Sequence, residues 1–188
     1  MRLMPTTPNP RFQCQCSTSI APISRRSWLT QTLALTSLGA LLPMSARAAD
    51  GEYEAMIISC IDPRFQRIVF DYARNNQLVD KYSHVALAGA SIAAVAEPLK
   101  DWHKAVWDNI ATSIQLHKVK RIVVLNHRDC GAARIAYGDA AVVSRDVEAI
   151  THRNALRTFA AQLKQRHPAM KVEMGLLELD GSVVMITV

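Results

Sequence analysis

Short apolar runs alternate along the chain with segments in which apolar residues recur every three or four positions. Residues 54–59 form the first run, which ends at Cys60 and predicts a buried strand. The pair Asp62-Pro63 then indicates the start of a helix that we expect to end near residue 75, because proline is favoured at the first helical position. The apolar residues expected on the inner face of this helix are Phe65, Ile68, Val69 and Tyr72.

The middle of the chain repeats this alternation. Residues 84–87 predict a second strand that ends near Gly89, and residues 121–126, which are short, β-branched and apolar, predict a third. An amphipathic helix is expected between them, because apolar residues recur there every four positions until residues 118–120 end the pattern. These apolar residues are Trp102, Val106, Ile110 and Ile114.

The C-terminal part of the chain completes the predicted fold. A helix is expected from about His152 to Arg166, and residues 172–179 and 182–188 flank Asp180-Gly181, a dipeptide typical of a tight hairpin. Strands that alternate with helices predict an α/β fold with a mainly parallel central sheet flanked by helices. The last two strands would add a C-terminal antiparallel hairpin to this sheet.

The first 48 residues differ from the rest of the chain. Arg25 and Arg26 form a twin-arginine pattern, an apolar stretch follows at residues 33–42, and Ala46-Arg47-Ala48 is typical of a cleavage site. In this order, the three features predict a twin-arginine signal peptide behind a disordered N-terminus, and therefore a periplasmic or otherwise exported protein. The alternative is a chance arginine pair before an uncleaved anchor, but the apolar stretch is shorter than the about 20 residues that span a bilayer.

Removal of this segment would change the charge of the protein. The whole chain carries a formal net charge of +6, but its first 48 residues hold five arginines and no acidic residue, which leaves +1 for residues 49–188. The remaining composition does not indicate a nucleic-acid partner, and after cleavage we expect no stable membrane insertion. Residues 49–188 have the length of one domain that can bury its own core.

Residues of metal-ligating types lie at the ends of two predicted strands. Cys60 follows one strand, His127 follows another, and Cys130 comes three residues later. Because ligands bind at the carboxyl ends of parallel strands, we expect the two thiolates and the imidazole to hold Zn²⁺ with a fourth position open, as in catalytic zinc sites. The alternative for two cysteines in an oxidising compartment is a disulfide, which would leave His127 without a role.

Asp62 and Arg64 lie beside the first thiol. Asp62 could bind the metal as a fourth ligand in a closed state, or turn away and accept a hydrogen bond from water in the open position. A guanidinium two residues away can hold the carboxylate in a bidentate pair, which would keep Asp62 ionised and off the metal. Gly131 would leave room for a small substrate. In the simpler interpretation, Asp62 only caps the following helix and Arg64 is its surface partner.

The motifs Cys60-x-Asp62-x-Arg64 and His127-x-x-Cys130-Gly131 resemble the signature of the β-class carbonic anhydrases. Residues 110–125 and 172–181 are similar to the helix, the strand and the closing hairpin of that family. The resemblance implies that the two cysteines and the histidine bind zinc and that the aspartate and arginine form a catalytic dyad. It also implies reversible hydration of carbon dioxide to bicarbonate by a homodimer or larger oligomer.

The chain departs from the family pattern near the predicted site. Residues 87–91 read Leu-Ala-Gly-Ala-Ser where the family usually has a stretch similar to Arg-Asn-Ala-Gly-Asn, and Asn126 and Ala132 replace two usual glycines. All five predicted site residues are retained. Two other functions fit the same motifs: a related zinc hydrolase of carbonyl sulfide or carbon disulfide, and a non-catalytic zinc-binding structural domain permanently closed by Asp62.

Overall fold

The computed structural model describes residues 51–187. The expected export signal at residues 1–48 lies outside this part of the chain, so the signal and the domain boundary after residue 48 stay predictions. Within residues 51–187, no helix is both long enough and apolar enough to cross a membrane.

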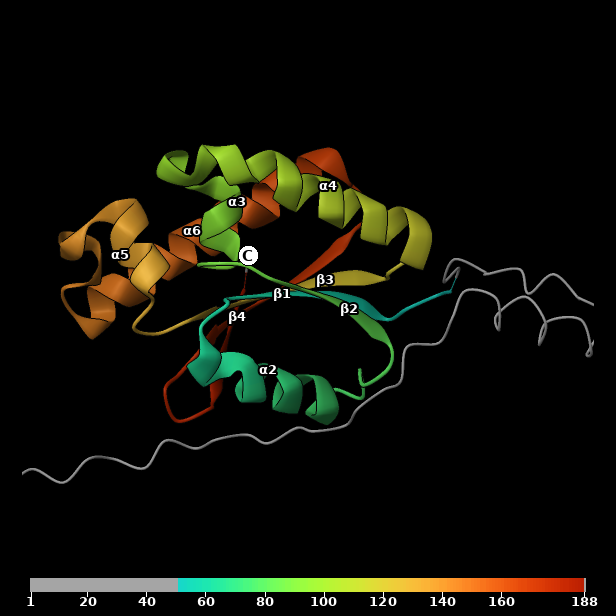
Figure 1. Ribbon diagram of the computed structural model, residues 1–188, viewed down its shortest axis with the longest axis horizontal. Coiled ribbons are helices and arrows are strands. Elements are labelled where there is room, and N and C mark those ends of the chain that lie inside the picture. The colour runs from blue at the N-terminus through green and yellow to red at the C-terminus, as the bar shows by residue number, and fades with distance from the viewer. Residues whose placement is uncertain (1–50, 188) are drawn as a thin grey trace, which may run out of the picture. The chain divides into compact units, whose positions relative to one another are not determined.

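Five strands form one sheet in the order β2-β1-β3-β4-β5 (Figure 1). Strands β2, β1, β3 and β4 pair in parallel, and β5 pairs antiparallel with β4. The predicted α/β fold with a C-terminal antiparallel hairpin is therefore confirmed. The strands are β1 (Ala55–Ser59), β2 (Tyr82–Ala86), β3 (Arg121–His127), β4 (Lys171–Leu177) and β5 (Val183–Ile186).

Helices cover both faces of the sheet, with α2 on one face and α3, α4 and α6 on the other (Figure 1). Successive residues of β1 point to opposite faces, so Ile57 packs in the core under α2 and Ile58 packs in the larger core on the other side. The helical elements are α2 (Pro63–Asn75), α3 (Ser91–Val95), η1 (Glu97–Leu99), α4 (Lys100–His117), α5 (Gly131–Tyr137), η2 (Asp139–Val142) and α6 (Arg145–Arg166).

The amphipathic pattern predicted α4 but assigned one residue to the wrong surface. Val106 and Ile110 are buried as expected, whereas Trp102 lies in the first turn of the helix and is 45% exposed. Trp107, off the four-residue pattern, fills the core instead and stacks on Phe159 with ring centroids 5.0 Å apart.

The predicted start of the last helix near His152 is wrong, because α6 begins at Arg145. Ser144 caps this helix through its hydroxyl oxygen, which accepts a hydrogen bond from the backbone N–H of Val147 at 3.3 Å. The first turns of α6 bury Glu148 and His152 rather than apolar side chains. Hydrophobic periodicity was therefore absent where the helix begins, and the short helices α3 and α5 were also missed.

Candidate metal centre

Three buried side chains converge at the carboxyl ends of β1 and β3. Cys60 directly follows β1, His127 is the last residue of β3, and Cys130 precedes α5. The parallel pairing of β1 with β3 brings these strand ends together, and the three ligand atoms lie within 4.8 Å of one another. Both cysteines are free thiols, so the structure favours the ligand interpretation over the disulfide.

The imidazole of His127 presents one nitrogen to this cluster. Its Nδ1 lies 2.7 Å from the carbonyl oxygen of Arg128, which can only accept, so the neutral ring carries its proton on Nδ1 and a free lone pair on Nε2. Nε2 is buried and has no hydrogen-bond partner within residues 51–187. The ring of Phe65, 4.1 Å away between centroids, packs against the imidazole. A buried nitrogen without a partner is costly, and a metal ion held by two sulfurs and this nitrogen would satisfy it.

Gly89 supports the thiol of Cys60. Its backbone N–H donates to the sulfur at 3.3 Å. Hydrogen bonding from the Cys130 thiol is the main cause that lowers the pKa of Cys60 to about 4, and the N–H of Gly89 also lowers it. The contact between the two cysteines, together with burial, raises the pKa of Cys130. Gly89 has φ +85°, and a Cβ there would lie 3.0 Å from that of Ala132. Position 89 therefore requires a glycine, and this glycine is one of the residues that the chain shares with the family pattern.

Arg64 holds the carboxylate of Asp62 in the predicted bidentate pair. Its Nε donates to Oδ1 at 3.0 Å and its Nη2 donates to Oδ2 at 2.7 Å. These hydrogen bonds are the main cause that lowers the pKa of Asp62 to about 2, so the carboxylate is ionised at neutral pH. Asp62 Oδ1 also accepts the backbone N–H of Arg64 at 3.0 Å, so the helix cap and the ion pair exist together.

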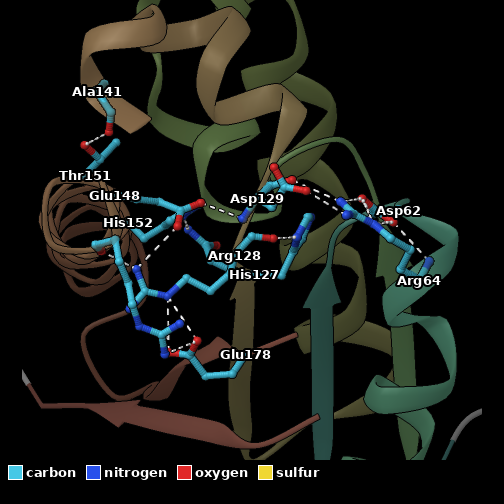
Figure 2. Close-up of polar contacts among 12 residues, drawn as sticks. Asp62, Arg64, His127, Arg128, Asp129, Ala141, Glu148, Thr151, His152 and Glu178 are labelled. Atoms are coloured by element: carbon cyan, nitrogen blue, oxygen red, sulfur yellow. Dashed lines mark hydrogen bonds and ion pairs between the residues drawn. The ribbon is translucent and has the colours of Figure 1, made fainter. Parts of the chain in front are cut away.

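Asp129, between two of the candidate ligands, also contacts Arg64 and was not predicted. Arg64 Nη1 donates to Asp129 Oδ2 at 2.7 Å, and Nη2 donates to the backbone oxygen of Asp129 at 3.0 Å. The guanidinium therefore contacts two aspartates at once (Figure 2). The only signal in the sequence was the position of Asp129 inside the His-x-x-Cys motif.

A buried polar network lies behind the loop that joins His127 to Cys130 (Figure 2). Arg128 donates from Nε to Glu178 at 3.2 Å and from Nη1 to the carbonyl oxygen of Arg145 at 2.6 Å. Glu148 of α6 accepts the backbone N–H of Asp129 at 2.6 Å and lies 3.4 Å from Arg128. The network therefore anchors the loop between His127 and Cys130 to α6, and periodicity could not reveal it because its members are polar.

Space for a small molecule lies next to the cluster. A cavity of about 270 Å³ is lined in part by Asp129, Cys130 and Arg134. A Cβ built on Gly131 would meet no atom within 4 Å, so there is open space beside this residue.

Comparisons with known proteins place the chain in a family. Residues 51–184 match a family model described as "Putative carbonic anhydrase". The chain is 33% identical over 135 residues to an uncharacterized protein of Rickettsia conorii, covering 72% of this chain and 73% of that protein. An uncharacterized protein of Rickettsia bellii is 31% identical, with 72% and 82% covered. The chain therefore belongs to this carbonic anhydrase family.

Solved structures with a similar fold are β-carbonic anhydrases. The enzyme CafA of Aspergillus fumigatus has a TM-score of 0.52 at 14% identity, covering 72% of this chain and 76% of that chain. A structure from the study of two tetrameric β-carbonic anhydrases of Sordaria macrospora has a TM-score of 0.50 at 13% identity, covering 73% and 82%. At these identities, the likeness shows the fold. The resemblance inferred from the two motifs is thus confirmed, and the chain is a divergent member.

Proposed function

We propose that this protein is a zinc-dependent carbonic anhydrase that converts carbon dioxide and water reversibly to bicarbonate and a proton. The observation that carries the proposal is the buried set of two sulfurs and one unpartnered imidazole nitrogen, with ligand atoms within 4.8 Å of one another. Cys60, His127 and Cys130 would hold the ion. Two thiolates, one neutral imidazole and an open position are typical of catalytic zinc.

The surrounding residues supply what the hydration reaction needs. When bound, zinc would acidify a water molecule, so that hydroxide forms near neutral pH. Asp62 is not among the clustered ligand atoms, and Arg64 donates to both of its carboxylate oxygens. With a pKa of about 2, the Asp62 carboxylate stays ionised and can only accept hydrogen bonds, so it would orient the nucleophile by accepting a hydrogen bond from it. This pairing also argues against a site permanently closed by Asp62.

Metal content followed by a carbon dioxide hydration assay tests the proposal. We expect close to one zinc per chain and a hydration rate well above that of buffer between about pH 7 and 9, the range in which zinc-activated water supplies hydroxide. A zinc-loaded protein no faster than buffer would exclude the proposal. Sulfide release from carbonyl sulfide or carbon disulfide, without carbon dioxide hydration, would instead favour the related hydrolase.

Assembly and export are part of the same proposal. Oligomers are supported by the tetrameric β-carbonic anhydrases of similar fold, and light scattering on purified protein would show a dimer or larger species. Export is supported by the twin-arginine pattern of the sequence. A change of Arg25 and Arg26 to lysine should keep the protein in the cytoplasm when cells are fractionated, and unchanged localisation would contradict export by this route.

A further inference from the structure

The guanidinium of Arg64 is held from two directions. Towards Asp62 it donates from Nε and Nη2, and towards Asp129 it donates from Nη1 to the carboxylate and from Nη2 to the backbone oxygen. Figure 2 shows these contacts in a row along the edge of the site. Because Nη1 donates to Asp129, the orientation of the guanidinium depends on both aspartates.

Asp129 is itself fixed by the fold. Its φ is +54°, in the left-handed region, and its backbone N–H donates to the buried carboxylate of Glu148 at 2.6 Å. Glu148 is buried, with a residue exposure of 7%. The position of Asp129 is thus determined by α6, whereas Arg64 has a long side chain that is 49% exposed. An exposed arginine needs a rigid partner to hold a single orientation.

We propose that Asp129 is a positioning residue that keeps Arg64 turned towards Asp62, and thereby keeps Asp62 off the metal. This inference rests on the metal-binding part of the proposed function. If Asp129 lost its carboxylate, Arg64 Nη1 would lose its negatively charged acceptor and the guanidinium could rotate away. Asp62 would then be released to occupy the open metal position.

A merely structural role for Asp129 would have a different signature. Both partners are about half exposed, with side-chain exposures of 49% for Arg64 and 57% for Asp129, and exposed ion pairs contribute little to stability. Loss of the Asp129 carboxylate should therefore leave the urea unfolding midpoint of the metal-free protein unchanged. The effect should appear at the open metal position.

The test uses two substitutions that tolerate the left-handed backbone, Asp129→Asn and Asp129→Gly. The full chain is loaded with Co²⁺, and azide binding at the open position is followed by visible absorption. We expect both variants to bind azide about two- to fivefold more weakly than the wild type, the range that one exposed ion pair supplies. The matched control is Asp108→Asn, which removes an exposed ion pair with Lys104 on α4 and should leave azide affinity unchanged.

A double-mutant cycle shows whether Asp129 acts through Arg64. In an Arg64→Ala background, Asp129→Asn should have no further effect on azide affinity. The inference would be overturned if both Asp129 variants bound azide with wild-type affinity, or if Asp108→Asn lost as much azide affinity as they do. It would also be overturned if Asp129→Asn still weakened azide binding in the Arg64→Ala background. Carbon dioxide hydration is measured separately. A protein that binds Co²⁺ and azide but does not hydrate carbon dioxide would contradict the proposed function and leave the Asp129 series decisive.

Discussion

The side-chain oxygen of Asn126 accepts two hydrogen bonds from Ser91, one from the backbone N–H at 3.1 Å and one from the hydroxyl at 2.9 Å. The Asn126 side-chain nitrogen lies 3.1 Å from Nδ1 of His152 on α6. All three residues are buried, and Asn126 immediately precedes His127. Asn126 and Ser91 are also positions where the chain departs from the family pattern. The loop at residues 87–91 is therefore joined to β3 by a buried polar contact.

The first prediction concerns this contact. Asn126→Ala would leave the polar groups of Ser91 and His152 without their partner, and we expect the free energy of unfolding to fall by about 2 kcal/mol. Zinc affinity should fall as well, because His127 is the next residue. Urea denaturation and competition with a chelator measure the two effects. Asn109→Ala, at an exposed position of α4, is the control, and equal losses in both variants would contradict the prediction.

The second prediction concerns the geometry of the Asp62–Arg64 pair. Arg64→Lys keeps the positive charge but cannot form two parallel hydrogen bonds, so Asp62 should be misplaced and kcat for carbon dioxide hydration should fall about tenfold or more. Zinc content should not change. Arg67→Lys, on the same helix and paired with Asp71, is the matched control. Wild-type kcat in Arg64→Lys would show that a positive charge alone is sufficient.

The third prediction concerns removal of the metal. Zinc that binds only the folded state should stabilise it by about 4 kcal/mol when free zinc exceeds its Kd a thousandfold. Calorimetry should therefore show a higher Tm with zinc than with a chelator. Cys60→Ser should largely abolish this difference, because it removes one of the three candidate ligands. An equal rise in Tm in the variant would indicate that zinc binds elsewhere.

The fourth prediction concerns the pH dependence of stability through Glu148. Burial raises the pKa of this carboxyl, but the nearby imidazole of His152, the hydrogen bond from the N–H of Asp129 and the charge of Arg128 together outweigh burial and lower the pKa below 4.5. Because the folded pKa lies below the unfolded value, the ionised group stabilises the fold above about pH 4.5, and this contribution is lost as the pH falls through the folded pKa. As the pH falls, the free energy of unfolding of the metal-free wild type should therefore decrease more than that of the Glu148→Gln variant.

Urea denaturation of both proteins between about pH 6 and 3.5, a range that spans this loss, measures the difference. The expected result is that the two unfolding free energies converge at the acid end. Parallel curves would show that Glu148 does not titrate differently in the folded and unfolded states.

Elements that bury apolar side chains were predictable from the sequence. Strands β1 and β3 and helix α2 follow this rule, since each buries a continuous run or a stripe of hydrophobic residues. The start of α6 was not predictable, because its first turns bury Glu148 and His152 instead of an apolar stripe, and Glu148 accepts the backbone N–H of Asp129 in the loop. Short helices such as α5 have too few turns to show a period.

The same division holds at the candidate metal centre. The sequence by itself determined the candidate ligand set and the Asp62–Arg64 pair, because these residues lie in two short motifs at strand ends and their chemistry is local. Only the tertiary structure decided that Asp129 contacts Arg64 and that Glu148 supports Asp129. These partners are 65 and 19 residues apart, and the register of the sheet and the packing of α6 bring them together. An aspartate in a loop and a glutamate on a helix are ordinarily solvated, so nothing in their residue types distinguishes them before the chain folds.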